Sequence, residues 1–184
     1  MLRKANFIFL ILIILLTNSV CMAKISADEM RLGGIHLGMD KVHVKNIMGE
    51  PDNIVTHTSS LKNKYVSVDE WIYYDPRAKK DPNYKKFWFK VFFAYDSAYK
   101  VRSQNPNFGT IAGINVFDKI DKIKKYYGNP DHGSDNYIAY EDDSEYTGGL
   151  MFKLLEMPDN TVVVSGIQMA LYALAIPLDN NMKD

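Results

Sequence analysis

The chain has 184 residues, of which 47% are hydrophobic, 12% aromatic and 24% charged, and its 22 basic residues equal its 22 acidic residues in number. This composition is typical of a globular protein and excludes a disordered chain, a collagen-like chain and a disulfide-stapled mini-domain. Nucleic-acid binding has no support either, because the sequence has neither a basic excess nor a groove-binding or base-stacking motif.

The first 23 residues have the order of a secretory signal peptide. Arg3 and Lys4 precede an apolar run at 7–16, and polar residues then lead to a small-residue site ending at Ala23. The apolar run is about half of the roughly 20 residues that a permanent transmembrane helix needs. We therefore expect 1–23 to be a signal peptide, cleavage to follow Ala23, and the mature protein to be periplasmic or secreted.

The alternative for this leader is a membrane-anchored lipoprotein attached through Cys21. A bacterial lipoprotein site usually has a small residue before the cysteine, whereas Val20 stands there. Membrane contact is expected only if Cys21 is lipidated. Since Cys21 is the single cysteine of the chain, cleavage after Ala23 also leaves a mature protein that cannot be a thiol enzyme.

Two segments of the mature chain resemble each other, because 35–52 lines up with 114–131 without a gap. In each segment the pattern predicts a short helix that an aspartate caps and that a glycine and a proline end. The caps are expected at Asp40 and Asp118, and the helices are expected to end at the aligned pairs Gly49/Gly128 and Pro51/Pro130.

Runs rich in aromatic and β-branched residues follow each helix and predict strands. They lie at 70–74, 86–95 and 98–102 after the first helix, and at 136–140, 150–155 and 161–169 after the second. We therefore expect an α+β protein made of two tandem repeats, each a short helical element followed by a three-stranded antiparallel sheet. The first repeat is placed at 24–109 and the second at 110–184, with the polar segment 105–109 as the joint.

Turn and packing motifs occur in a fixed order in the first repeat: Ile35-x-Leu37-Gly38-Met39, a short helix, Gly49-Glu50-Pro51-Asp52, Trp71-Ile72-Tyr73, and a strand closing on Tyr95-Asp96. This order resembles that of the small SmpA/BamE outer-membrane assembly lipoproteins. In tandem it resembles the β-lactamase inhibitor protein, which is two helix-plus-sheet units side by side. The second repeat departs from the motif, since it lacks the Gly-Met pair and the tryptophan. The resemblance implies a fold and carries over no contact residue.

Motifs for catalysis and cofactor binding are missing from the sequence, including the Gly-x-Ser-x-Gly elbow, the phosphate-binding glycine loop and His-Glu-x-x-His. The four histidines lack the short ligand spacings of a zinc site. The acidic stretch 141–145 lacks the alternating ligands of a calcium loop and favours a solvated turn. We therefore expect no enzyme, no catalytic residue, no metal and no cofactor. The alternative is a hydrolase with an unrecognised site.

The strand at 86–95 is apolar on both faces, whereas a half-buried antiparallel strand has one polar face. Its second face is either covered by another layer or is an exposed aromatic patch that marks a protein interface. The sequence leaves open which face of the neighbouring strand lies beside it. We predict Trp71, Tyr73, Trp88 and Phe92 as partner-binding residues, with core packing as the alternative.

The loop between the first two strands carries a basic cluster, while the corresponding hairpin of the second repeat carries the acidic stretch. Such a dipolar surface orients a charged partner. We therefore expect an exported, non-catalytic protein-binding or cell-envelope assembly module of bacterial type, which recognises another protein of the envelope through an aromatic sheet face. A lipid-anchored envelope scaffold is a further alternative.

Overall fold

The computed structural model describes residues 25–61, 64–142 and 148–171. The predicted signal peptide at 1–23, its cleavage site and Cys21 lie outside these residues, as does most of the acidic stretch 141–145.

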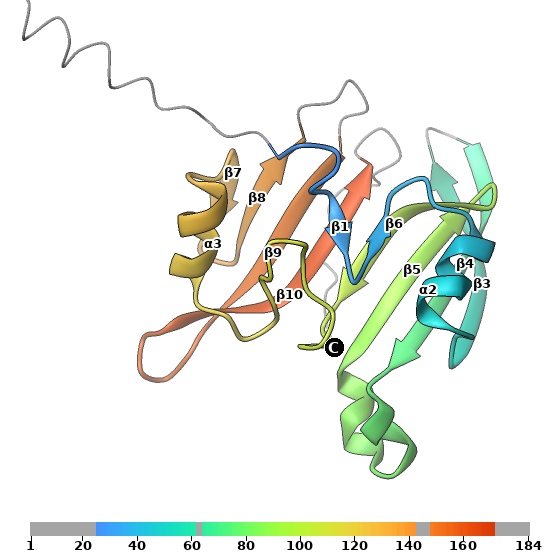
Figure 1. Ribbon diagram of the computed structural model, residues 1–184, viewed down its shortest axis with the longest axis horizontal. Helices are drawn as coiled ribbons and strands as arrows, with labels where there is room; N and C mark the ends of the chain where they lie inside the picture. Colours follow the sequence, from blue (N-terminus) through green and yellow to red (C-terminus); the bar gives the residue numbers. More distant parts are fainter. Residues whose placement is uncertain (1–24, 62–63, 143–147, 172–184) are drawn as a thin grey trace, which may run out of the picture.

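A single antiparallel sheet of eight strands forms the body of the molecule, in the order β3-β4-β5-β6-β10-β9-β8-β7 (Figure 1). The first half of the chain supplies one half of the sheet and the second half supplies the other. The two halves join where β6 pairs with β10, with Val101 opposite Met169. The strands are β3 (Asn53–Leu61), β4 (Lys64–Tyr74), β5 (Trp88–Ala94), β6 (Ser97–Ser103), β7 (His132–Ser134), β8 (Tyr137–Glu141), β9 (Gly148–Glu156) and β10 (Val162–Leu171).

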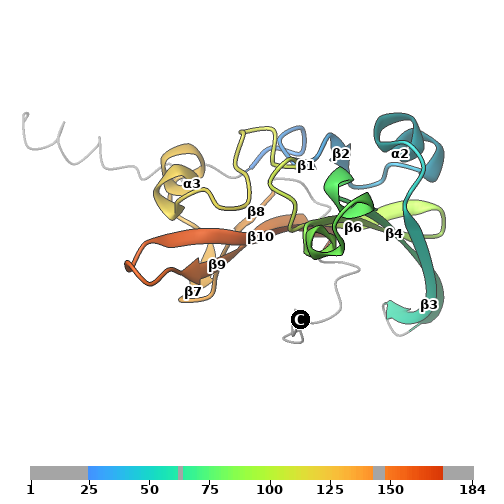
Figure 2. The same cartoon turned by 90° about the horizontal axis from the view of Figure 1, so that it is seen from below.

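Two α-helices of the described residues, α2 (Lys41–Met48) and α3 (Ile120–Tyr127), cover the same face of this sheet (Figure 2). Helix α2 lies over the β3–β6 half and α3 over the β7–β10 half. A small sheet of β1 (Arg31–Leu32) and β2 (Ile35–His36) lies on the same side. We call this side the helix face and the opposite side the helix-free face.

The predicted helix ends are confirmed in part. Asp40 Oδ1 accepts the N–H of His43 at 2.8 Å, so it is the N-cap of α2. Gly49 and Gly128 end the helices with positive φ angles of 81° and 77°. Asp118 does not cap α3: its carboxylate accepts the N–H of Asn115 instead, and the cap of α3 has no side-chain bond.

One hydrophobic core lies between the helix face and the elements that cover it, and it runs through both halves. Val44 of α2 and Ile123 of α3 are fully buried in this same cluster, together with Leu32 of β1. A smaller cluster lies on the helix-free face and consists of Val66, Val68, Phe92, Ala94 and Tyr99. The sheet is therefore apolar on both faces in its first half.

The predicted fold class is wrong. The molecule is mostly sheet, and its strands form one continuous eight-stranded sheet rather than two separate three-stranded sheets. One reason is β3, whose polar threonines and serines resemble a loop in the sequence. Another is β7, which is only three residues long. Pairing of β6 with β10 depends on contacts between residues far apart in the chain, which local patterns do not report.

Candidate functional site

Trp71 and Tyr73 lie on the helix face. In the register of β4 and β5, Trp71 is opposite Val91 and Tyr73 is opposite Phe89. All of these side chains are buried in the main core, where the Trp71 ring packs on Phe93 with centroids 4.9 Å apart. Burial also raises the pKa of the Tyr73 hydroxyl. These two residues therefore hold the helix layer on the sheet.

Trp88 and Phe92 lie on the helix-free face, because Trp88 is opposite Tyr74 and Phe92 is opposite Glu70. Trp88 is half-buried, whereas Phe92 is 5% exposed and belongs to the smaller cluster. The four predicted partner-binding residues thus do not share one face. Of the two registers that the sequence left open, the structure adopts the one that places Tyr74 beside Trp88.

Cations lie over the aromatic rings of the helix-free face. Lys90 Nζ is 4.6 Å and Arg102 Cζ 5.4 Å from the centroid of the Trp88 ring, and Lys100 Nζ is 4.1 Å from that of Phe92. Lys90 also makes an ion pair of 2.7 Å with Glu70. We call this surface the basic–aromatic face, and define it by Tyr74, Trp88, Phe92, Tyr99, Lys85, Lys90, Lys100, Arg102 and Lys153.

This arrangement follows from strand registers. Lys90 is opposite Arg102 across β5 and β6, and Phe92 is opposite Lys100. Each cation therefore lies beside a ring or another cation on the same face, an arrangement in which hydrocarbon stems pack on apolar surface. Burial raises the pKa of the Tyr99 hydroxyl to about 12. In the sequence, the alternation of lysine or arginine with apolar residues at 100–102 was the available signal for this face.

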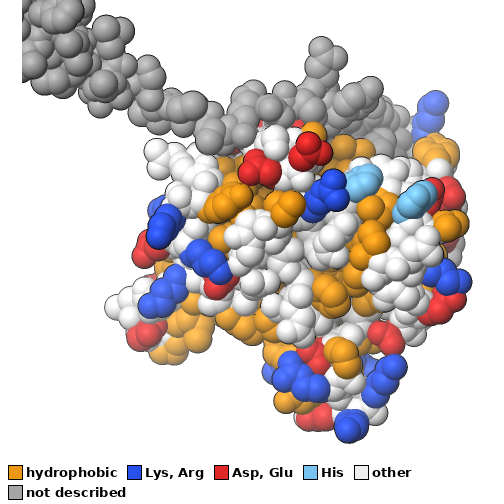
Figure 3. Space-filling view, in the orientation of Figure 1, with side chains coloured by type: hydrophobic (Ala, Val, Ile, Leu, Met, Phe, Trp, Pro, Cys, Tyr) orange, Lys and Arg blue, Asp and Glu red, His pale blue; other side chains and the backbone are white. Residues whose placement is uncertain are grey.

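The basic loop predicted from the sequence folds into two short 3-10 helices, η1 (Pro76–Lys79) and η2 (Pro82–Lys86). Figure 3 shows Lys and Arg side chains gathered over this segment at the lower end of the molecule. Arg77 is held by the buried carboxylate of Asp75, with Nε 2.8 Å from Oδ1. Lys85 Nζ reaches to 5.8 Å from the Tyr74 ring and extends the basic–aromatic face.

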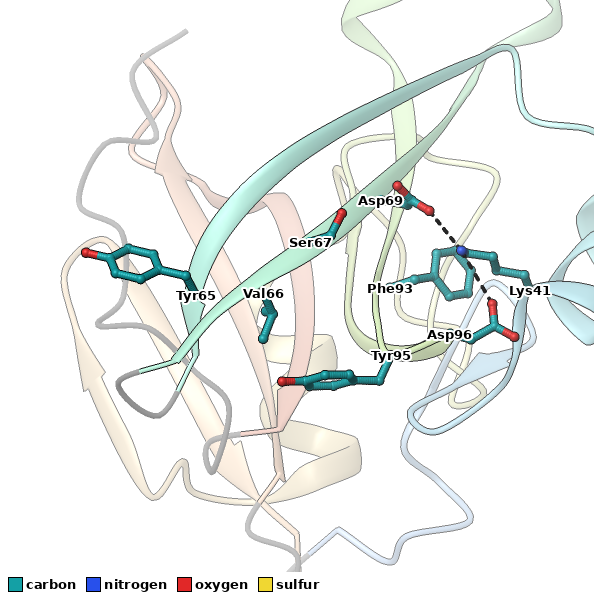
Figure 4. A pocket seen from close by; sticks show the side chains of 8 residues that line it. All are labelled: Lys41, Tyr65, Val66, Ser67, Asp69, Phe93, Tyr95 and Asp96. Atoms are coloured by element: carbon teal, nitrogen blue, oxygen red, sulfur yellow. Dashed lines mark hydrogen bonds and ion pairs between the residues drawn. The ribbon is translucent and has the colours of Figure 1, made fainter.

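A separate pocket of about 460 Å³ lies where α2, β4 and the β5–β6 turn meet (Figure 4). Lys41 points between two carboxylates in it, with Nζ 2.8 Å from Asp69 Oδ2 and 3.4 Å from Asp96 Oδ1. No local sequence pattern indicates this cluster, since Lys41 and Asp69 are 28 positions apart. The lining residues are Lys41, Tyr65, Val66, Ser67, Asp69, Phe93, Tyr95 and Asp96.

The charges of this pocket stabilise one another. The hydrogen bond to Asp69 raises the pKa of Lys41, and the bonds from Lys41 and the Thr56 hydroxyl lower the pKa of Asp69. Both groups therefore stay charged at neutral pH, so Lys41 is neither a base nor a nucleophile there. The turn residues Tyr95 and Asp96 have positive φ angles of 51° and 65°, a strained conformation that directs the Asp96 carboxylate to Lys41.

Within the described residues, no group of three or more His, Cys, Asp or Glu side chains is placed to hold a metal ion. No helix in the same ranges is both long enough and apolar enough to cross a membrane.

Comparisons with known proteins find no matching family model and no matching curated protein. Two solved structures resemble the chain weakly. An extracellular protein containing a SCP domain from Bacillus anthracis str. Ames has a TM-score of 0.43 and 10% identity, over 82% of this chain and 47% of its own. A cysteine-rich secretory protein from Staphylococcus aureus subsp. aureus Mu50 has a TM-score of 0.48 and 9% identity, over 80% of this chain and 48% of its own. The chain spans about half the length of each.

The resemblance to the SmpA/BamE lipoproteins and to the β-lactamase inhibitor protein is wrong. No family model matches the sequence, and the strands form one continuous eight-stranded sheet rather than two helix-plus-sheet units side by side. The quoted motifs are turn and packing signals, such as Gly49-x-Pro51 after a helix. Any fold that needs a helix end followed by a strand can use them.

Proposed function

We propose that this protein is an exported, non-catalytic binding module that takes an acidic segment of another cell-envelope protein on its basic–aromatic face. The observation that carries the proposal is the set of cation–ring contacts on the helix-free face. No helix or strand of the described residues forms a second layer there.

Charge and ring chemistry determine the kind of partner. Five cations, namely Lys85, Lys90, Lys100, Arg102 and Lys153, are placed on this face by the strand registers and the Lys85 contact. Lys90 is paired with Glu70, and Lys100 and Arg102 also have interaction partners within the chain. This cluster of cations complements carboxylates, which steer association and fix the register of a complex. Tryptophan and arginine at the centre of such a surface supply most of the binding energy.

Export is proposed from the leader, whose charged, apolar and small-residue order is that of a signal peptide. The descriptions of the two weakly similar structures as extracellular and secretory are compatible with export. The alternative of a lipid anchor at Cys21 predicts acyl chains on that residue, which mass spectrometry of the exported protein detects.

The binding proposal is tested by placing a photo-cross-linking residue at Gln168, which lies on the helix-free face opposite Arg102. The exported protein is irradiated in envelope extract and the cross-linked peptide is sequenced. We expect an acidic peptide. Its synthetic copy is then titrated against the wild type, against Lys100→Glu/Lys153→Glu and against Trp88→Ala, with folding checked by circular dichroism. We expect each variant to weaken binding by at least about tenfold.

The matched control is Lys124→Glu/Lys125→Glu, which makes the same charge change on two exposed lysines of α3, on the other side of the sheet. This control should bind the peptide like the wild type at equal ionic strength. A basic or neutral cross-linked peptide, or equal loss of binding in control and test variants, contradicts the proposal.

A further inference from the structure

Strand β3 is an edge of the sheet without the usual protection against pairing. It is the terminal strand of the sheet order, so its outer backbone groups have no strand partner among the described residues. Natural edge strands avoid pairing by being short, by carrying charges or prolines, or by a bulge. β3 has nine residues, Asn-Ile-Val-Thr-His-Thr-Ser-Ser-Leu, with no Lys, Arg, Asp, Glu or Pro. Its pairing with β4 runs without a bulge.

The opposite edge of the same sheet shows the contrast. β7 has only three residues, one of which is Gly133, and beside it His132 Nε2 lies 2.8 Å from the Glu141 carboxylate. This edge is short and charged. Of the two edge strands in the described part of the chain, β3 alone is long enough to template another strand.

We propose that β3 pairs antiparallel with β3 of a second copy of this chain, about a two-fold axis at His57, so that two eight-stranded sheets become continuous. The uncharged strand can lie against itself without like charges meeting. The charged groups at the two ends of the strand are bound within the same copy or lie on the neighbouring strand: Glu50 pairs with Lys45, Asp52 accepts the N–H of Tyr74, and Lys64 is the β4 partner of Leu61. The edge itself therefore presents no charge that would oppose an antiparallel two-fold pairing.

The side chains of β3 fit an interface between copies. Ile54 is 52% exposed and Val55 41% exposed, although both belong to a strand that is fully paired on its inner side. Pairing about His57 sets Val55 of one copy opposite Ser59 of the other, on the helix-free side. The axis is perpendicular to the sheet, so both basic–aromatic faces lie on the same side of the dimer.

The register makes a charge-swap test possible. In Val55→Lys/Ser59→Lys, the two-fold axis sets introduced lysines opposite each other in two symmetric pairs. In Val55→Lys/Ser59→Glu, it sets an introduced lysine opposite an introduced glutamate. The two double variants change the same positions of a solvent-facing strand and differ only in the sign of one charge, so loss of folding affects them alike.

The measurement is sedimentation equilibrium of the exported protein and both variants at several concentrations. We expect a dimer for the wild type, a dissociation constant raised by about tenfold or more for the lysine pair, and retention of the dimer for the lysine–glutamate pair. A monomeric wild type overturns the proposal. If neither variant changes the dissociation constant, the dimer uses another surface and the proposal is wrong. If both variants raise the dissociation constant equally, Val55 does not face Ser59 and the proposed register is wrong.

Discussion

Single glycines determine how tightly the small β1–β2 hairpin packs on the sheet. Gly33 and Gly34 form its turn, with φ angles of 59° and 81°. A Cβ on Gly33 would come within 2.8 Å of the Phe89 ring, which is fully buried, whereas a Cβ on Gly34 would meet only Ile47 at 3.6 Å. The two positions therefore share a backbone requirement and differ in packing.

This difference predicts unequal effects of the same substitution. Gly34→Ala should lower the free energy of unfolding by about 1 kcal/mol, because a positive φ disfavours a side chain. Gly33→Ala should lower the free energy of unfolding by roughly 1–3 kcal/mol more than Gly34→Ala does, because the buried Phe89 ring must also move. Urea unfolding followed by circular dichroism measures both. Equal losses would show that Phe89 moves aside freely.

At the scale of elements, Lys41 connects α2 to β4 and to the β5–β6 turn. Its ion pair with Asp69 is partly buried, with 30% and 27% of the two side chains exposed. Lys41→Met should lower the free energy of unfolding by about 1 kcal/mol near neutral pH. The control is Lys45→Met on the same helix, whose pair with Glu50 is mostly exposed, and which should cost much less.

The pH dependence of this loss follows from the two pKa shifts. The pKa of Asp69 is lowered, so its contribution is present above the unfolded value and is lost as the pH falls through the folded pKa. The pKa of Lys41 is raised, so its contribution is complete below the unfolded value and is lost as the pH rises through the folded pKa. The difference between the wild type and Lys41→Met should therefore be constant near neutral pH and shrink at both extremes.

The elements also show what a sequence can predict. The cap and end of α2 and the strands with dense aromatic or β-branched residues can be predicted because their signals are local: Asp40 caps α2, Gly49 ends it, and β5 is rich in aromatic residues. The pattern does not predict β3, because threonine and serine fit a strand or a loop equally well. The faces of Trp71 and Trp88 were not determined, since a shift of one residue in register exchanges the two faces.

At the scale of the whole molecule, one core and one sheet span both halves, so we expect the described part to unfold as a single unit. Buried tyrosines in both halves of the sheet can report its unfolding. Tyr73 and Tyr99 lie in the first half of the sheet, whereas Tyr127 of α3 and Tyr140 of β8 lie in the second, and all four are buried.

Alkaline unfolding tests this cooperativity. Burial raises the pKa of Tyr99, Tyr127 and Tyr140 to about 12. Their contribution to stability is complete below the unfolded pKa of about 10 and is lost as the pH rises through about 12. We expect the tyrosinate absorbance of the buried rings to rise in one step, together with the loss of far-ultraviolet circular dichroism. Two separate steps would show that the halves unfold independently, and absorbance that rises in full while the dichroism persists would show that the rings ionise without unfolding.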